Sequence, residues 1–228
     1  MSLTSLLTAT FALRNTLTGP IPVLAELPDT TVTILRSDQF LVGSSKSPSV
    51  VLREETGQQA DFPLLIVPLT ISNRAAPPNG ISVRSIEGAL SVLQAGRTIF
   101  RSEYVWYRLT TSSAEPDPET KADRLVVETA APVAPFDVPG GSTWSREVLL
   151  IPRESWAAQD WKMFEDNVTR HCSQECQSGL SIRVRFDNGM SLTAQCSFSI
   201  DRHVMAHVRG LERRFFTSPT CRAGGKPQ

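Results

Sequence analysis

The alternation of apolar and polar positions is clearest in residues 180–200, where it predicts a β-hairpin. Apolar and polar side chains alternate without a break over residues 190–200, the period-2 pattern of a strand with one buried and one solvated face. Apolar side chains also occupy every second position of residues 180–186. We therefore expect two antiparallel strands that both pack one face on a hydrophobic core.

The turn of this hairpin contains three residues, Asp187, Asn188 and Gly189. A two-residue loop would place Phe186 opposite Ser191, and the apolar faces of the two strands would then point to opposite sides of the sheet. A three-residue loop pairs Phe186 with Met190 and keeps the apolar faces together. In such a loop Gly189 takes the position with positive φ, which glycine adopts without a steric penalty.

Other short apolar or β-branched runs, separated by glycine, proline and asparagine, predict further strands. They cover residues 30–35, 50–52, 62–73, 81–92, 99–109, 125–128, 136–138 and 144–151. Pro68 lacks a ladder donor, which favours an edge or a bulge. Leu64 and Ile66 make the first half of their strand apolar on both sides. The parity of apolar positions switches between Val83 and Ile86, which predicts a β-bulge there.

Two segments interrupt the strand pattern. Apolar side chains recur at helical spacing after a plausible N-cap, Ser155, and predict an α-helix near residues 155–168 that covers an open end of the sheet. This helical face consists of Ala157, Trp161, Phe164 and Val168. Residues 111–123 are polar, with alternating proline and acid, and predict a disordered insert.

Short strands joined by such turns are typical of an all-β sandwich or barrel, and not of βαβ units. We expect a single β-sandwich domain over residues 29–221. Residues 1–28 form an apolar segment and a proline-rich spacer, and residues 222–228 form a disordered tail. Between the hairpin and this tail we expect a short C-terminal helical or irregular segment, with a strand as the alternative.

Residues 64–86 carry a fold-level resemblance. The pattern runs through Leu69, Thr70, Ile71, Ser72 and Asn73, a loop of small residues and proline, and a restart at Gly80 and Ile81. It resembles the second and third strands of bacterial immunoglobulin-like domains of the cell-adhesion-related type. The resemblance implies an immunoglobulin-like β-sandwich that binds or spaces at the cell surface, and it transfers no functional residues. The early strand lacks a cysteine, no tryptophan follows at the usual distance, and the predicted helix is an addition.

All four cysteines lie in the last quarter of the chain: Cys172, Cys176, Cys196 and Cys221. An even number of clustered cysteines predicts two disulfides and an extracytoplasmic compartment, either periplasmic or at the cell surface. Three connectivities exist, and we favour Cys172 with Cys176 and Cys196 with Cys221. The second bond closes a loop of about 26 residues, which contributes roughly 3 to 4 kcal/mol through chain entropy. The alternative is a cytosolic structural protein with four reduced thiols.

A second alternative is a metal-binding protein. Two cysteines, Cys172 and Cys176, and two histidines, His203 and His207, are each spaced i and i+4, and a Cys2His2 set binds Zn²⁺ tetrahedrally. However, roughly 26 residues separate the two pairs, where compact zinc fingers use about 12 to 15. We therefore expect no cofactor, with zinc as the alternative.

The formal net charge is zero and the sequence pI is near 6.8, which argues against nucleic acid as a partner. The sequence contains no Gly-x-Ser-x-Gly elbow and no phosphate-binding glycine loop, and only three histidines, so we do not expect an enzyme. Together, these features predict a non-enzymatic extracytoplasmic interaction or scaffold module with a protein partner at the cell surface or envelope.

Residues 1–13 are largely apolar and uncharged. They are shorter than the roughly 20 apolar residues of a membrane-spanning helix, and they lack the basic start and the cleavage site of a signal peptide. Three interpretations remain open, namely a short or truncated membrane anchor, an artefact of expression or of the gene start, and a surface segment. The first of these would give membrane association.

Overall fold

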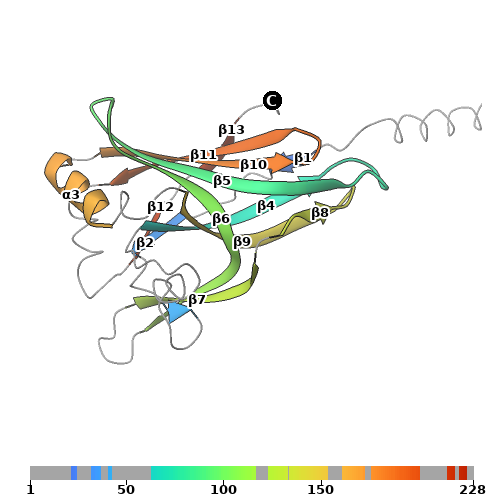
Figure 1. Ribbon diagram of the computed structural model, residues 1–228, viewed down its shortest axis with the longest axis horizontal. Helices are drawn as coiled ribbons and strands as arrows, with labels where there is room; N and C mark the ends of the chain where they lie inside the picture. Colours follow the sequence, from blue (N-terminus) through green and yellow to red (C-terminus); the bar gives the residue numbers. More distant parts are fainter. Residues whose placement is uncertain are drawn as a thin grey trace, which may run out of the picture.

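The computed structural model describes residues 22–24, 32–36, 41–42, 63–116, 123–132, 134–153, 161–172, 176–200, 215–218 and 221–224. These residues form thirteen strands and the helix α3 (Trp161–His171), so the predicted all-β class is confirmed (Figure 1). The strands are β1 (Pro22–Leu24), β2 (Val32–Arg36), β3 (Leu41–Val42), β4 (Pro63–Asn73), β5 (Ile81–Gln94), β6 (Arg97–Pro116), β7 (Asp123–Pro132), β8 (Phe136–Val138), β9 (Thr143–Pro152), β10 (Cys176–Phe186), β11 (Ser191–Ile200), β12 (Phe215–Ser218) and β13 (Cys221–Gly224).

Backbone pairing joins all of these strands into one sheet. Its main path runs β12-β2-β4-β9-β6-β5-β10-β11-β13, and three strands branch from this path, β1 beside β4, β7 beside β6 and β8 beside β5. β3 adds to β7 as the parallel pair, and the other described pairs are antiparallel. The sheet curls into a half-barrel (Figure 1). Its largest cluster of buried apolar side chains lies on the inner face.

The last two strands lie at opposite ends of this path, although only residues 219 and 220 separate them in the sequence. Three peptide units span at most about 11 Å, so the curl of the sheet must bring its two ends at least that close together. β12 pairs with β2, and β13 pairs with β11. The C-terminal segment therefore connects the two ends of the sheet.

Strands occupy parts of three stretches for which the sequence predicted a helical or irregular segment, a tail and a spacer. Residues 201–214, which make up most of the predicted helical or irregular C-terminal segment, lie outside the described residues, whereas residues 215–218 and 221–224 each find a strand partner, the alternative that the sequence left open. Residues 222–224 lie in β13 and not in a tail. The predicted spacer contains β1, which pairs with β4. The predicted strand at 50–52 and residues 1–13 lie outside the described residues.

The hairpin of β10 and β11 has the predicted register. Val184 lies opposite Leu192, and Ile182 lies opposite Ala194. The Phe186 amide donates a hydrogen bond to the Met190 carbonyl oxygen at 3.0 Å, which closes the three-residue turn. Gly189 has a φ of 83°, so the requirement for glycine at this position is confirmed.

The predicted bulge in β5 is also confirmed. Arg185 of β10 lies opposite Ser85, whereas the next residue, Phe186, lies opposite Val83. One extra residue of β5, Arg84, therefore falls between two pairs and is exposed. This extra residue explains why the apolar parity of the sequence switches here without moving Ile86 off the core face.

Pro68 lies at a local edge of β4. One side of β4 pairs with β9 over residues 65–72. The other side is shared, because β2 pairs with residues 63–66 and β1 pairs with residues 71–73. Pro68 falls in the interval between these two partners, which is a local edge of β4, so the predicted edge position is confirmed.

Side chains of seven strands (β4, β5, β6, β8, β9, β10 and β11) and of α3 build the hydrophobic core. Leu65, Ile71, Leu90, Tyr104 and Leu150 are 0% exposed. On the opposite face of β4, Leu64 and Ile66 are buried as well, as the two-sided apolar pattern of this strand predicts. The sheet is therefore covered on both faces near the start of β4.

Residues 111–116 and 123 lie in strands and not in a disordered insert. They continue β6 and start β7, and the two strands pair from Thr110–Thr129 to Pro116–Asp123. Thr111 and Ser113 keep their polar side chains exposed. Main-chain pairing extends this hairpin, because ladder hydrogen bonds do not depend on apolar side chains, and the prediction from hydropathy is wrong for these residues.

The helix α3 lies at the end of the sheet where β5 turns into β6 and where β10 begins (Figure 1). Phe164 and Val168 are fully buried, and the Phe164 ring meets the Phe100 ring edge to face at 5.0 Å between centroids. The predicted helical face therefore packs on the core. The predicted start at Ser155 lies outside the described residues, and the helix ends three residues beyond the predicted end, at His171.

Candidate functional site

The outer face of the sheet is hollowed across β6, β5, β10 and β11. Two adjoining hollows of about 290 and about 300 Å³ share Ala89, Arg101 and Ser181. We call their combined outward-facing surface the outer trough. It is lined by Glu87, Gly88, Ala89, Ser91, Arg101, Glu103, Arg153, Gly179, Ser181, Arg183, Arg185, Gln195 and Ser197.

The sheet register produces the hollow by aligning small side chains. In one row across the sheet, Ser91 of β5 lies opposite Gly179 of β10, and Gly179 lies opposite Ser197 of β11. In the next row Ala89 lies opposite Ser181. Because successive strands are about 4.8 Å apart, this floor of small residues extends about 10 Å from β5 to β11.

Charged side chains surround this floor. Glu87 forms ion pairs with Arg153 at 2.9 Å and with Arg185 at 3.2 Å. Glu103 pairs with Arg101 at 3.5 Å and more loosely with Arg153 at 3.9 Å. These side chains are partly or mostly solvated, so each pair contributes little stability, on the order of 0 to 1 kcal/mol. Their main effect is to hold the guanidinium groups around the trough.

Arg183 differs from the other arginines of the outer trough. Its side chain is exposed and lies between Glu87 of β5 and Thr193 of β11 in the register. Within the described part of the chain it makes no ion pair or hydrogen bond. Four arginines against two glutamates leave a formal charge of +2 in the outer trough, although the whole chain is neutral.

These groups can bind an anion. A guanidinium group presents a planar fork of N–H donors that matches a carboxylate in a bidentate arrangement. Hydroxyl groups of Ser91, Ser181 and Ser197 and the amide of Gln195 line the floor and can add neutral hydrogen bonds. The outer trough therefore has the composition of a binding surface for a polar ligand with negative charge.

Tyr104 lies on the inner face, opposite Gly88 of the trough strand β5. Its side chain is fully buried, and burial raises the pKa of its hydroxyl far above the ordinary value of 10.0. The Ser102 side chain lowers this pKa by a smaller amount, although the geometry between the two groups falls short of a hydrogen bond. Tyr104 is therefore a neutral core residue at physiological pH.

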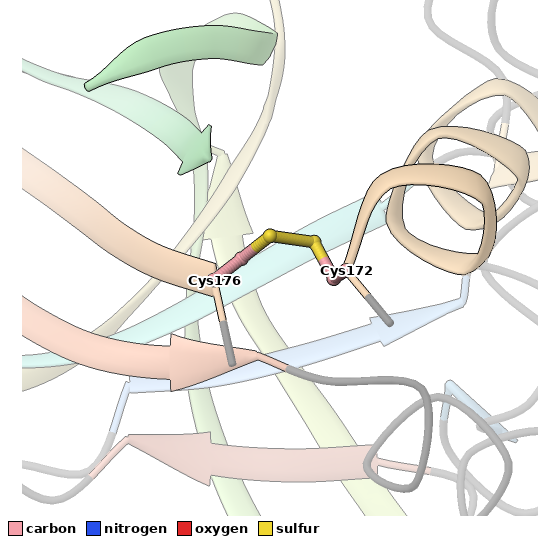
Figure 2. The surroundings of a disulfide bond; sticks show 2 residues. All are labelled: Cys172 and Cys176. Atoms are coloured by element: carbon pink, nitrogen blue, oxygen red, sulfur yellow. A yellow bond between two sulfur atoms is a disulfide. The ribbon is translucent and has the colours of Figure 1, made fainter. Parts of the chain in front are cut away.

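The predicted bond between Cys172 and Cys176 is confirmed. Figure 2 shows the two sulfur atoms joined between the end of α3 and the start of β10. The Cα atoms are 5.4 Å apart, and both residues are about 1% exposed. This bond attaches the helix to the first strand of the hairpin.

Cys196 lies on the core side of β11, 1% exposed, and is disulfide-bonded. Cys221 of β13 is directly opposite it in the backbone register. Directly opposite residues of antiparallel strands have Cα atoms about 4.5 to 5.5 Å apart, which suits a disulfide. The register is therefore the one that the predicted Cys196–Cys221 pairing requires.

The four proposed zinc ligands divide into two groups. Cys172 and Cys176 are bonded to each other, a form in which neither sulfur is a thiolate ligand. His203 and His207 lie outside the described residues. Within the described ranges no group of three or more histidine, cysteine, aspartate or glutamate side chains is placed to hold a metal ion.

The outer trough was not predicted from the sequence. The polar face of residues 180–186 was visible in the sequence, but it predicts only a solvated strand. Ser91 and Gly179 are 88 residues apart, and their contact depends on β5 and β10 being neighbours. The signal in the sequence was the set of glycine, alanine and serine at positions where strands commonly carry larger side chains.

No protein-family model matches the chain, and no curated protein or solved structure shows significant similarity to it. Across the described ranges, no helix combines the length and apolar character needed to span a bilayer.

Proposed function

We propose that this protein is an extracytoplasmic interaction module without enzymatic activity, which presents the outer trough to a protein partner at the cell surface or envelope. The observation that carries the proposal is the oxidised state of the sulfur atoms. Cys172 and Cys176 form a disulfide, and Cys196 is disulfide-bonded. Disulfides persist in oxidising compartments and are rare in the cytosol.

The outer trough supports the interaction part of the proposal. Its side chains offer guanidinium, carboxylate, hydroxyl and amide groups on the sheet, and ion pairs with Glu87 and Glu103 place three of its four arginines, Arg101, Arg153 and Arg185. Arginine is enriched in protein interfaces, because its fork and long stem make several contacts at once. The immunoglobulin-like sandwich that the sequence resembles fits the same role, and we keep it as part of the proposal.

A thiol count on full-length protein purified from its natural source tests this proposal. The protein is denatured without a reductant, and its free thiols are titrated. We expect no free thiol among the four cysteines, and fractionation should place the protein outside the cytoplasm. Four free thiols would contradict the proposal and favour either the cytosolic structural protein or the zinc protein, which metal analysis then separates.

A further inference from the structure

We propose that the outer trough binds an extended protein segment carrying two carboxylates four positions apart. The inference rests on the proposed function, since it specifies the partner chemistry of the interaction module. The observation behind it is the unpaired Arg183 in a hollow of about 300 Å³ that Arg101 also lines. These two arginines are the proposed anchors for the carboxylates.

The positive charge of the outer trough favours an anionic ligand. The two glutamates disfavour a ligand whose negative charges lie close together. The outer trough has a formal charge of +2, but Glu87 and Glu103 remain within it. A densely charged polymer such as nucleic acid or a sulfated polysaccharide would place anionic groups beside both of these carboxylates, and like charges repel. A segment with separated carboxylates can meet the arginines and avoid the glutamates.

The register gives the spacing. Arg101 lies opposite Ser91, which lies opposite Gly179, and Arg183 is four residues further along β10. From strand rise and strand separation, the Cα atoms of the two arginines are about 17 Å apart. Both side chains line the same hollow, and four residues of strand rise, about 13 Å, separate their two rows along the strand direction. Residues i and i+4 of an extended segment are about 13 Å apart and face the same way, which matches.

The floor accommodates such a segment. Ala89, Gly179 and Ser181 leave room for main chain to approach the sheet, since none has a long side chain. The hydroxyl groups of Ser181 and Ser197 can donate to main-chain carbonyl groups of the bound segment. Arginine forks supply the charged contacts, and the floor supplies the neutral ones.

The test uses the oxidised full-length protein and labelled nine-residue peptides in a fluorescence anisotropy titration at low salt. The first peptide has glutamates at its third and seventh positions among serines and glycines. In the second both glutamates are replaced by glutamine, and in the third the two glutamates are adjacent. We expect the first peptide to bind about tenfold more tightly than the second and more tightly than the third.

Variants of the protein identify the site. Arg101→Ala and Arg183→Ala should each weaken binding of the first peptide by about fivefold to tenfold. Arg146→Ala is the matched control, because Arg146 is an exposed arginine of β9 outside the outer trough, and it should not change binding. Glu87→Gln should tighten binding about threefold or more, since it releases Arg153 and Arg185 from their ion pairs. A purely structural role of Glu87 would not produce tighter binding.

Several results would overturn the inference. The first is equal affinity for the glutamate and glutamine peptides. The second is an equal loss of affinity for the first peptide in Arg183→Ala and Arg146→Ala, in variants with unchanged melting temperature. The third is tighter binding of a heparin fragment than of the first peptide. Absence of peptide binding with all four cysteines oxidised would contradict the proposed ligand but not the proposed interaction module. Four free thiols would contradict the proposed interaction module, regardless of the peptide-binding results.

Discussion

The buried side-chain amide of Asn73 donates a hydrogen bond to the main-chain oxygen of Val138, 3.1 Å away and 65 residues further along the chain. The same amide donates to the main-chain oxygen of Asn79 at 2.7 Å, and its oxygen accepts from the Ala75 amide at 3.1 Å. One side chain thus joins the loop after β4 to the end of β8, and it does so at 1% exposure.

We expect Asn73→Ala to destabilise the protein by about 2 to 4 kcal/mol, because the substitution removes two buried hydrogen bonds, with Val138 and Ala75, and one part-buried hydrogen bond with Asn79. Chemical denaturation of the oxidised protein measures this change. Asn188→Ala, in the exposed hairpin turn, is the control and should cost less than about 1 kcal/mol. Equal midpoints for the wild type and Asn73→Ala would show that these hydrogen bonds contribute nothing net.

A comparison of Asn73 with Gly189 shows what sequence reasoning can reach. The positive φ of Gly189 follows from residues within a few positions of it, because hairpin register and turn chemistry are local. Asn73 looked like the last residue of an apolar strand, and its partner Val138 is distant in the chain. The turn at Gly189 and the bulge at Arg84, which depend on neighbouring residues, are confirmed, whereas the contacts of Asn73, which depend on which strands pair, were not predicted.

The arrangement of the strands shows the same division. Alternation in the sequence predicts that one face of β10 and of β11 is buried, and the structure confirms it. Alternation says nothing about strand order, so neither the connection of the sheet ends through β12 and β13 nor the row of Ser91, Gly179 and Ser197 was predicted. These features depend on long-range pairing, which no single segment encodes.

The hairpin turn gives the second prediction. Gly189 has a φ of 83°, and a Cβ atom placed there would meet nothing within 4 Å. A side chain at this position would therefore reduce stability through backbone strain and not through a steric clash. We expect Gly189→Val to lower the free energy of unfolding by about 1 to 3 kcal/mol in chemical denaturation.

Gly80→Ala is the matched control for Gly189→Val. Gly80 has no positive φ, and its nearest neighbour to an added Cβ would be the Val138 carbonyl oxygen at 4.0 Å. This substitution should change stability by less than about 0.5 kcal/mol or stabilise slightly, since alanine reduces the entropy of the unfolded chain. Equal effects of the two variants would show that the left-handed conformation of Gly189 is not required.

Tyr104 gives a prediction for alkaline pH. Burial holds its pKa in the folded protein far above 10.0, whereas in the unfolded chain the hydroxyl ionises near pH 10. Above pH 10 the unfolded state therefore loses a proton that the folded state keeps, so stability falls as pH rises. Up to the pKa of the folded state, the fall due to Tyr104 is about 1.4 kcal/mol per pH unit.

The variant Tyr104→Phe isolates this effect from other groups that titrate at high pH. It should match the wild type or exceed it in stability at pH 7, because the buried hydroxyl forms no hydrogen bond within the part of the chain that the structure describes. Between pH 10 and 12 the difference in unfolding free energy between this variant and the wild type should increase with pH. Tyr107→Phe, the substitution of the second tyrosine of the chain, is the control. Parallel pH profiles for Tyr104→Phe and the wild type would show that Tyr104 ionises in the folded state.

The last prediction concerns the connection between the sheet ends. Cys196 of β11 lies opposite Cys221 of β13, and a bond between them closes a loop of about 26 residues. Cys196→Ala and Cys221→Ala should each lower the free energy of unfolding by about 3.5 kcal/mol under oxidising conditions, and the double variant should cost little more than either one. With a reductant the differences from the wild type should shrink to the packing loss at Cys196. Additive losses of unfolding free energy under oxidising conditions would mean that the two cysteines act independently and that no disulfide between them holds β13.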